Sequence, residues 1–265
     1  MNLNIQNEYD KLIKVVLSPT DAKYQNQQNE LINILKKYNV EILMTEKNDQ
    51  AKYQMFTRDP FIVIGDSILL NHMKEDFRQI ELPTFNDILK DINKDKIIYL
   101  DKETIIEGGD LLIHNDIIFL GQNGNRTNKE GLEYLRNNFS KYKIIPLNMI
   151  NPNPYIPFVH LDCIFNIVSN DTAIIYKEGF TKESLSIIEE VFPNLISITS
   201  KEQDELASNV ICLENKVVIV QKRHTNIIEQ LTNLGFSIET MSLYDTVEQT
   251  GYTRCLTCPL EREKK

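Results

Sequence analysis

The stretch that decides the fold is GGDLLIHNDIIFLG, residues 108–121. Two apolar runs flank an Asn115-Asp116 turn, and this pattern predicts a β-hairpin. The same design recurs in RDPFIVIGDSILLN (58–71), HLDCIFNIVSNDTAIIYK (160–177) and SNVICLENKVVIVQK (208–222). Because the turns follow one another roughly every fifty residues, they indicate a repeated structural unit.

Each hairpin is followed by a helical pattern and then by a short strand. Leu, Ile and Phe recur at spacings of three and four in 128–140, 182–194 and 225–236, as expected for helices with one apolar face. Short apolar strands follow at 96–100, 143–147, 195–199 and 237–243. The repeated unit is therefore β-β-α-β.

The N-terminal part contains this unit without its first strand. Residues 11–19 and 40–44 read as strands, with a helix at 29–39 between them, and TRCLTCPL (253–260) can supply the missing strand. We therefore predict an α/β fold, a five-bladed pseudo-symmetric α/β propeller of ββαβ repeats, as a single domain over 1–265. The alternative is an ordinary α/β domain in which the spacing is coincidental.

Composition narrows the range of partners. The chain has 265 residues, is 42% hydrophobic and carries a net charge of -9. It lacks a block of basic residues, so we expect no nucleic acid and no membrane surface as partner. The polar start MNLNIQNEYDKLIK does not resemble a signal peptide, and we expect a cytoplasmic protein that binds a cationic or zwitterionic small molecule. No nucleotide-binding motif follows a strand, so no cofactor is expected.

Reactive residues stand immediately before the first strand of each unit. We call these segments the heads of the units: Thr57-Arg58-Asp59, Glu107-Gly108-Gly109-Asp110, His160-Leu161-Asp162, Ser208-Asn209 and Arg254-Cys255. If rotation about one axis relates the units, the heads converge at one end of that axis. One cysteine, one histidine and four carboxylates then share a pocket.

The four cysteines, Cys163, Cys212, Cys255 and Cys258, are too few and too unevenly spaced for a disulfide framework. Cys255 falls in the repeat register and is the candidate nucleophile. Cys258 lies three residues on, an odd step that turns it to the other face of an extended strand. Zinc would need two further ligands with finger-like spacing, which the sequence lacks, so no metal is predicted. A redox pair would open a helix, and this position before Pro259 does not.

Four motifs resemble those of a known group of enzymes: FTRDP (56–60), EGGD (107–110), HLDCIF (160–165) and RCLTCPLER (254–262). They are similar to motifs of the guanidino-group-modifying enzymes of the pentein fold, which include arginine deiminases, dimethylarginine dimethylaminohydrolases and amidinotransferases. The four blocks in this order are jointly specific, whereas EGGD alone would be a weak signal.

The resemblance implies roles for five residues. Cys255 would attack the guanidino carbon, His160 would act as general acid and base, and Glu107 would orient that histidine. Asp59 and Asp162 would hold the guanidinium nitrogens. The chemistry requires the same residue types, because carboxylates bind a planar cationic donor well, a thiolate is a strong nucleophile, and histidine exchanges protons near neutral pH.

Each of the remaining candidate substrate-binding residues has two interpretations. Asp110 is either a turn or cap residue or a contact to the substrate's amine. Arg126 and Arg78 stand where members of this group place arginines that meet a substrate carboxylate, and the alternative is a solvated surface arginine. Arginine deiminases also carry a glycine-rich segment with an arginine before the catalytic cysteine. Here that segment reads DTVEQTGYTRC, with Glu248 and only Arg254, so strict deiminase specificity is in doubt.

These expectations predict a hydrolase that acts on the guanidino or ureido group of arginine or an arginine derivative. A covalent cysteine thiouronium would give a citrulline-type product plus ammonia or an amine. An amidinotransferase that passes the amidino group to a second amine is the first alternative. A non-enzymatic pentein binding module is the second. The oligomeric state stays open, with a homo-oligomer among the states the sequence allows.

Overall fold

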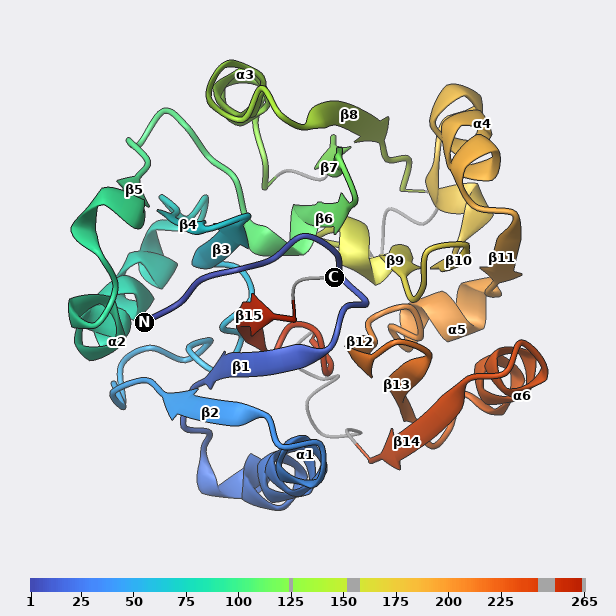
Figure 1. The fold of residues 1–265 in the computed structure, drawn as a ribbon, viewed down its shortest axis with the longest axis horizontal. Helices are drawn as coiled ribbons and strands as arrows, with labels where there is room; N and C mark the ends of the chain where they lie inside the picture. Colours follow the sequence, from blue (N-terminus) through green and yellow to red (C-terminus); the bar gives the residue numbers. More distant parts are fainter. Residues whose placement is uncertain (124–125, 152–157, 243–250, 264–265) are drawn as a thin grey trace.

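Five small sheets surround a common centre, and the longer helices lie on the outside (Figure 1). The computed structural model describes residues 1–123, 126–151, 158–242 and 251–263. Every sheet has three strands, in the spatial orders β15-β1-β2, β3-β4-β5, β6-β7-β8, β9-β10-β11 and β12-β13-β14. The predicted five-bladed α/β propeller is confirmed.

The strands in chain order are β1 Leu12–Leu17, β2 Glu41–Met44, β3 Phe61–Ile64, β4 Ser67–Leu70, β5 Ile97–Tyr99, β6 Leu111–His114, β7 Ile117–Gln122, β8 Lys143–Asn148, β9 Phe165–Ile167, β10 Thr172–Ile175, β11 Asn194–Ser197, β12 Ile211–Glu214, β13 Val217–Gln221, β14 Ser237–Met241 and β15 Cys258–Arg262. The α-helices are α1 Gln25–Lys37, α2 Asn86–Lys90, α3 Lys129–Asn138, α4 Lys182–Val191, α5 Ser200–Asp204 and α6 Thr225–Asn233. Short 3₁₀ helices are η1 Ala22–Tyr24, η2 Asp76–Phe85, η3 Lys94–Lys96, η4 Gly108–Asp110, η5 Leu161–Cys163 and η6 Lys177–Gly179.

All five blades follow one pairing rule. In the third blade, β6 pairs antiparallel with β7 across the expected turn, and β7 pairs parallel with β8 after the chain crosses through α3. The turn residue Asn115 has a φ of 55° and Gly65, in the equivalent turn of the second blade, has a φ of 61°. Glycine and asparagine tolerate this left-handed conformation best, which explains why the turns were visible in the sequence.

The last strand of the chain closes the ring. β15 pairs antiparallel with β1, with Val16 opposite Cys258, and the N-terminal segment crosses the centre of the molecule (Figure 1). There the backbone N–H of Asn4 donates to the oxygen of Leu260 at 3.0 Å. This strand begins at Cys258, later than the predicted 253. Cys255 therefore lies in a turn before the strand, and the expectation of an extended backbone at Cys255 was wrong.

Two crossover connections differ from the sequence pattern. Helix α1 begins at Gln25, four residues before its predicted start. The second blade, for which we predicted no specific helix, crosses through η2 and the short α2. Pro83 lies inside η2 and lacks the N–H that an α-helix interior needs, so this connection is mainly 3₁₀. The predicted strand at 237–243 extends to a position outside the described residues.

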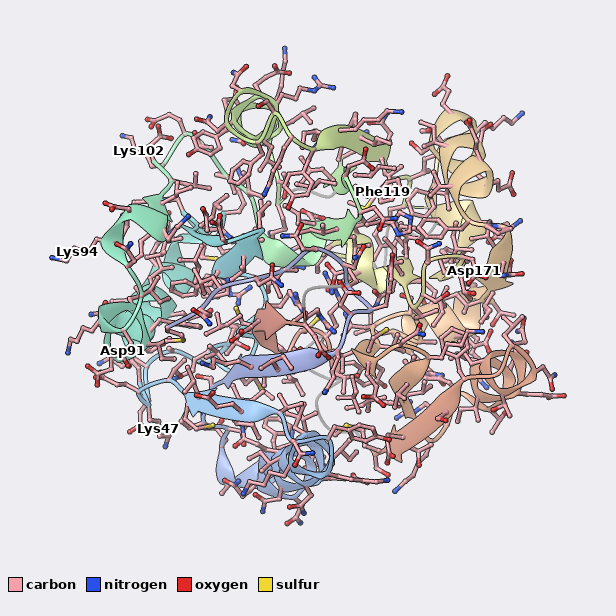
Figure 2. The ribbon with its side chains drawn as sticks, viewed as in Figure 1. Lys47, Asp91, Lys94, Lys102, Phe119 and Asp171 are labelled. Atoms are coloured by element: carbon pink, nitrogen blue, oxygen red, sulfur yellow. The ribbon has the colours of Figure 1, made fainter. Side chains whose placement is uncertain are left out.

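The first strands of the blades are almost entirely buried, whereas outer strands such as β2 and β5 contain exposed and half-buried residues. All four residues of β3 and of β6 are buried. Figure 2 shows Phe119 of β7 in the interior and Lys47, Lys94 and Lys102 on the outer rim. Each buried Leu, Ile or Phe contributes about 1.5–3 kcal/mol. None of the described helices has the length and apolar composition needed to cross a bilayer.

Removal of β15 should open the ring. A chain that ends at Thr257 loses the fully buried Leu260 and leaves one edge of β1 unpaired, so we expect its melting temperature to fall by roughly 10 °C or more. Thermal unfolding followed by circular dichroism measures this. The matched control ends at Arg262 and retains the strand. Equal melting temperatures for both truncated chains would contradict ring closure by β15.

Candidate active site

Hydrogen bonds join the five heads into a closed circle. Gly108 N–H donates to Asp59 O at 3.2 Å, Leu161 N–H to Asp110 Oδ1 at 2.9 Å, Ser208 Oγ to Asp162 O at 3.0 Å, Arg254 N–H to Asn209 Oδ1 at 3.1 Å, and Arg58 N–H to Cys255 O at 3.2 Å. Each bond links one blade to the next around the centre. The predicted convergence of the heads is therefore observed.

Two glycines allow this close approach. A Cβ atom on Gly108 would lie 2.0 Å from the backbone oxygen of Arg58. A Cβ on Gly109 would lie 2.6 Å from Cγ of His160. Both distances are far below van der Waals contact, so only glycine lets the EGGD segment pass between the neighbouring heads.

A cavity of about 150 Å³ opens beside the heads. Its lining consists of Tyr53, Phe56, Asp59, Phe77, Arg78, Arg126, Val159, His160 and Cys255. The sulfur, the imidazole and one of the four expected carboxylates, Asp59, thus line one small space, whereas Glu107, Asp110 and Asp162 are not among the lining residues. A larger groove of about 660 Å³ lies on the outer rim beside α2 and β5, but its charged side chains, such as Lys90 and Lys94, are exposed.

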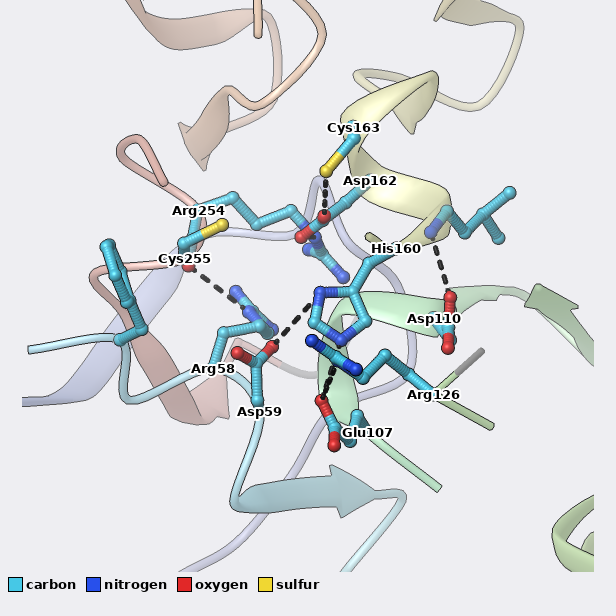
Figure 3. A network of polar contacts seen from close by, with 12 residues as sticks. Arg58, Asp59, Glu107, Asp110, Arg126, His160, Asp162, Cys163, Arg254 and Cys255 are labelled. Atoms are coloured by element: carbon cyan, nitrogen blue, oxygen red, sulfur yellow. Dashed lines mark hydrogen bonds and ion pairs between the residues drawn. The ribbon is translucent and has the colours of Figure 1, made fainter. Parts of the chain in front are cut away.

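His160 lies between two carboxylates (Figure 3). Its Nε2 donates to Glu107 Oε2 at 2.8 Å, and its Nδ1 lies 3.8 Å from Asp59 Oδ1. Burial by itself lowers the pKa of this imidazole, but the charge of Asp59 and the hydrogen bond to Glu107 outweigh burial and raise the pKa to about 10. His160 is therefore a cation at neutral pH and can donate a proton.

Cys255 is held in the turn before β15. Its side chain is 4% exposed, and Asn209 Nδ2 donates to its sulfur at 3.1 Å. Burial, followed by the charges of Asp162 and Asp59, raises the pKa of this thiol well above its usual value. The resting site thus combines a protonated thiol with a protonated imidazole. Cys258 begins β15, where its thiol donates to Phe61 O at 3.5 Å, and it does not line the cavity.

Asp162 belongs to a buried ionic cluster behind the cavity. Its Oδ2 lies 3.2 Å from Arg254 Nε. The guanidinium of Arg254 also pairs with Glu8 of the N-terminal segment and donates to Leu111 O at 2.9 Å. Despite this pairing, burial raises the pKa of Asp162. Arg254 therefore faces the interior and not the cavity.

Asp110 is engaged in structural hydrogen bonds. Its Oδ2 accepts from Thr127 Oγ1 at 2.7 Å and from Thr127 N–H at 3.2 Å, and its Oδ1 accepts from Leu161 N–H. Burial raises its pKa to about 6. Of the two sequence readings of Asp110, this geometry supports the structural one, because the carboxylate orients the segment next to His160 and does not line the cavity.

The two candidate arginines differ in their environment. Arg78 is buried, donates to Asp59 Oδ2 at 2.9 Å and binds Glu81 with two bonds of 2.9 Å each. Its charge is thus already compensated by two carboxylates. Arg126 is 22% exposed, pairs with Glu75 at 2.6 Å, and its Nε lies 3.7 Å from Glu107 Oε2.

Asp59, Glu107 and His160 are close enough to hold a metal ion, because their ligand atoms lie within 4.8 Å of one another. Their charges argue against this use. A histidine binds a metal ion only through a neutral imidazole, whereas the carboxylates keep His160 protonated. The guanidinium groups of Arg78 and Arg126 add further positive charge beside these carboxylates. The cluster is better suited to proton transfer than to metal binding.

Sequence reasoning missed three residues of this network. Asn209 was recognised as a head but received no role, although its place in the repeat register was a visible signal. Glu81 stands three residues after Arg78, a spacing at which helical side chains meet. Glu8 had no local signal, because 246 residues separate it from Arg254. His72, His114 and His224 do not line the cavity. Glu248 lies outside the described residues.

Comparison with known proteins identifies relatives over nearly the whole chain. The family model described as "N,N dimethylarginine dimethylhydrolase, eukaryotic" matches residues 2–262. The uncharacterized protein YkgA of Bacillus subtilis (strain 168) is 31% identical over 260 residues, which cover 94% of this chain and 88% of YkgA. The arginine deiminase of Streptococcus gordonii is 28% identical over 252 residues, or 79% of this chain. The match covers 60% of that deiminase's length.

Solved structures share the fold. An amidinotransferase of Microseira wollei from the saxitoxin biosynthetic pathway superposes with a TM-score of 0.86 at 18% identity, over 99% of this chain and 98% of its own. The product-bound N-terminal domain of a cyanobacterial arginine dihydrolase from the ornithine-ammonia cycle gives a TM-score of 0.84 at 19% identity, over 96% of this chain and 98% of its own. At sequence identities this low, the similarity of these structures to this chain is a similarity of fold.

The protonation of His160 can be tested directly. NMR titration of labelled histidines should show no His160 transition between pH 6 and 8 in the wild-type protein. Asp59→Asn removes the charge that raises the pKa of His160 most, so we expect the His160 transition to move to a pH lower by about 1–3 units. His114, whose pKa burial lowers, serves as the internal control and should not change. A wild-type His160 that titrates near 6.5, its ordinary value, would contradict this charge arrangement.

Proposed function

This chain belongs to the family described as "N,N dimethylarginine dimethylhydrolase, eukaryotic", within the guanidino-modifying enzymes of the pentein fold, and from this premise we propose that it hydrolyses the guanidino group of arginine or an arginine derivative. The observation that carries the proposal is Asp59 Oδ1, a buried oxygen beside the cavity that accepts no hydrogen bond from any described residue. A buried carboxylate oxygen requires a donor. A guanidinium provides a planar, cationic one.

The substrate's groups can be matched to the cavity from its inner end outward. Asp59 binds the guanidinium nitrogens, which places the guanidino carbon beside Cys255. Asp162, which lies behind the cavity beside Arg254, acts on the bound cation through its charge. Tyr53 and Phe77, with ring centroids 5.6 Å apart, cover an apolar stem. Arg126 binds the carboxylate of an amino acid. We do not assign this role to Arg78, because it is buried and bound by Asp59 and Glu81, whereas Arg126 is partly exposed.

Substrate binding prepares the nucleophile. A bound guanidinium adds a positive charge beside Asp59 and Asp162, the carboxylates that oppose ionisation of Cys255, and so lowers the pKa of the thiol. The thiol proton leaves to water. The thiolate then forms a bond to the guanidino carbon, and the electron pair of the C=N bond moves onto nitrogen. Catalysis thus begins only when the cation occupies the site.

His160 transfers the protons of both half-reactions. Its imidazolium donates a proton to the leaving nitrogen as the C–N bond breaks, and ammonia or an amine departs from a thiouronium on Cys255. The neutral imidazole then accepts a proton from a water molecule that attacks the same carbon. The C–S bond breaks with its electron pair on the sulfur of Cys255, and that sulfur takes up the remaining hydroxyl proton as the C=O of the ureido product forms. Glu107 keeps the imidazole aimed at the cavity throughout.

The first test uses Cys255→Ser and mass spectrometry of the products from L-arginine and N,N-dimethylarginine. We expect citrulline with ammonia or dimethylamine from the wild-type protein, and a rate lower by about 1,000-fold or more without the thiolate. Cys258→Ser is the matched control, since that thiol lies outside the cavity, and should retain activity. Substantial turnover by Cys255→Ser would exclude Cys255 as the nucleophile.

The second test distinguishes hydrolysis from amidino transfer. Both reactions pass through the same thiouronium, and only the acceptor differs. We expect the ureido product from arginine to stay unchanged when glycine or lysine is added at millimolar concentration. Mass spectrometry with isotope-labelled amines detects any transfer. Labelled guanidino product formed in proportion to the added amine would replace the hydrolase assignment with an amidinotransferase.

A further inference from the structure

We propose that Asn209 is a further residue of the reaction, which positions Cys255 and stabilises its thiolate through a hydrogen bond to the sulfur. This inference rests on the proposed role of Cys255 as the nucleophile. It concerns a head residue for which the sequence motifs suggest no part.

The side chain of Asn209 contacts Cys255 at two points. Its Oδ1 accepts from the backbone N–H of Arg254 at 3.1 Å and from that of Cys255 at 3.2 Å. Its Nδ2 donates to the sulfur of Cys255 at 3.1 Å. Asn209 is 1% exposed, so water does not compete for these bonds. One rigid amide therefore holds both the turn and the sulfur.

The orientation of this amide follows from its partners. An asparagine amide offers an oxygen that only accepts and a nitrogen that only donates. The two backbone N–H groups of Arg254 and Cys255 can donate only to the oxygen, which leaves the nitrogen directed at the sulfur. The direction of the N–H···S bond is thus set by the backbone, and it does not depend on how the two similar amide atoms are distinguished.

Asn209 occupies a position at which three other blades have an aspartate. The head residues that precede the first strands of the second, third and fourth blades are Asp59, Asp110 and Asp162, and Asn209 occupies the corresponding place in the fifth. An aspartate there would direct a carboxylate oxygen at the sulfur. Asparagine has nearly the same shape, but its Nδ2 donates a hydrogen bond, so a neutral donor stands where the repeat pattern would place another negative charge.

The surroundings of the sulfur show why a donor matters. The titratable and charged side chains that act on Cys255 or share its cavity are Asp59, Asp162, Cys163, Arg254, His160, Arg78 and Arg126. Asp162 and Asp59 oppose formation of the thiolate. Asn209 Nδ2 donates a side-chain hydrogen bond to this sulfur, and a backbone hydrogen bond at Tyr252 also favours the thiolate. A hydrogen bond to the charged form of a group favours that form.

Two substitutions separate the two functions of the amide. Asn209→Ala removes the acceptor and the donor. Asn209→Asp keeps an acceptor for the backbone N–H groups but replaces the donor with a carboxylate oxygen, which is ionised at the alkaline pH where a buried thiol titrates. Asn166→Ala is the matched control, because the Asn166 amide donates to Ser208 O at 3.0 Å and Val210 O at 2.7 Å, and so supports the same loop without a contact to Cys255.

The measurement is the rate of Cys255 alkylation by iodoacetamide as a function of pH, with the modified cysteine identified by peptide mapping. We expect the inflection of the profile to rise by about one to two pH units in Asn209→Ala, and further in Asn209→Asp. The alkylation rate at pH 7 should fall by roughly 3- to 10-fold, since the stronger nucleophilicity of a more basic thiolate offsets about half of the loss. Asn166→Ala should keep the wild-type inflection.

An unchanged inflection in Asn209→Asp would overturn the inference, because the amide would then serve the backbone alone. An equal shift in all three variants would also overturn it, since this would indicate general loosening of the loop. Alkylation needs no substrate, so these outcomes are independent of the proposed reaction. Failure of the proposed function appears instead as retained turnover in Cys255→Ser.

Discussion

The circle of hydrogen bonds between the five heads is the constraint on which the rest of the structure depends. Each blade is a small three-stranded sheet that could not bury both of its faces alone, and the circle ties each blade to the next around the centre. The same bonds bring Asp59, His160 and Cys255 to one cavity. The contacts that connect the blades are therefore the contacts that assemble the site.

The buried carboxylates at the centre of the ring are balanced by neighbouring positive charges. Arg78 pairs with Asp59, Arg254 lies beside Asp162, and the imidazole of His160 stays protonated next to Glu107. Unpaired buried carboxylates would be costly. One oxygen of Asp59 nevertheless remains without a hydrogen bond, which creates a preference for a cationic ligand and couples ligand binding to ionisation of the thiol.

Much of the site could be predicted because the reactive residues stand at a fixed place in a repeat. The placement of Asp59, His160 and Cys255 at one cavity was predicted in this way, and Cys258 lies outside that cavity, although the argument from an extended strand did not hold for a residue in a turn. Asp110 and Arg78 were harder to interpret. Their motifs identify both residues. A motif does not reveal that Thr127 and Leu161 donate hydrogen bonds to the carboxylate of Asp110. Nor does it reveal that Glu81 compensates the charge of Arg78.

The number of units, the order of their elements, the hairpin turns and the residues at each head can be derived from the amino-acid sequence, because these depend on local chain geometry and on apolar periodicity. Only the tertiary structure decided which polar groups pair inside the ring. Glu8 meets Arg254 across 246 positions of sequence, and Asn209 reaches Cys255 from another blade. Such contacts leave no periodic trace in the chain, because burial and charge compensation act between residues that the fold, and not the local sequence, brings together.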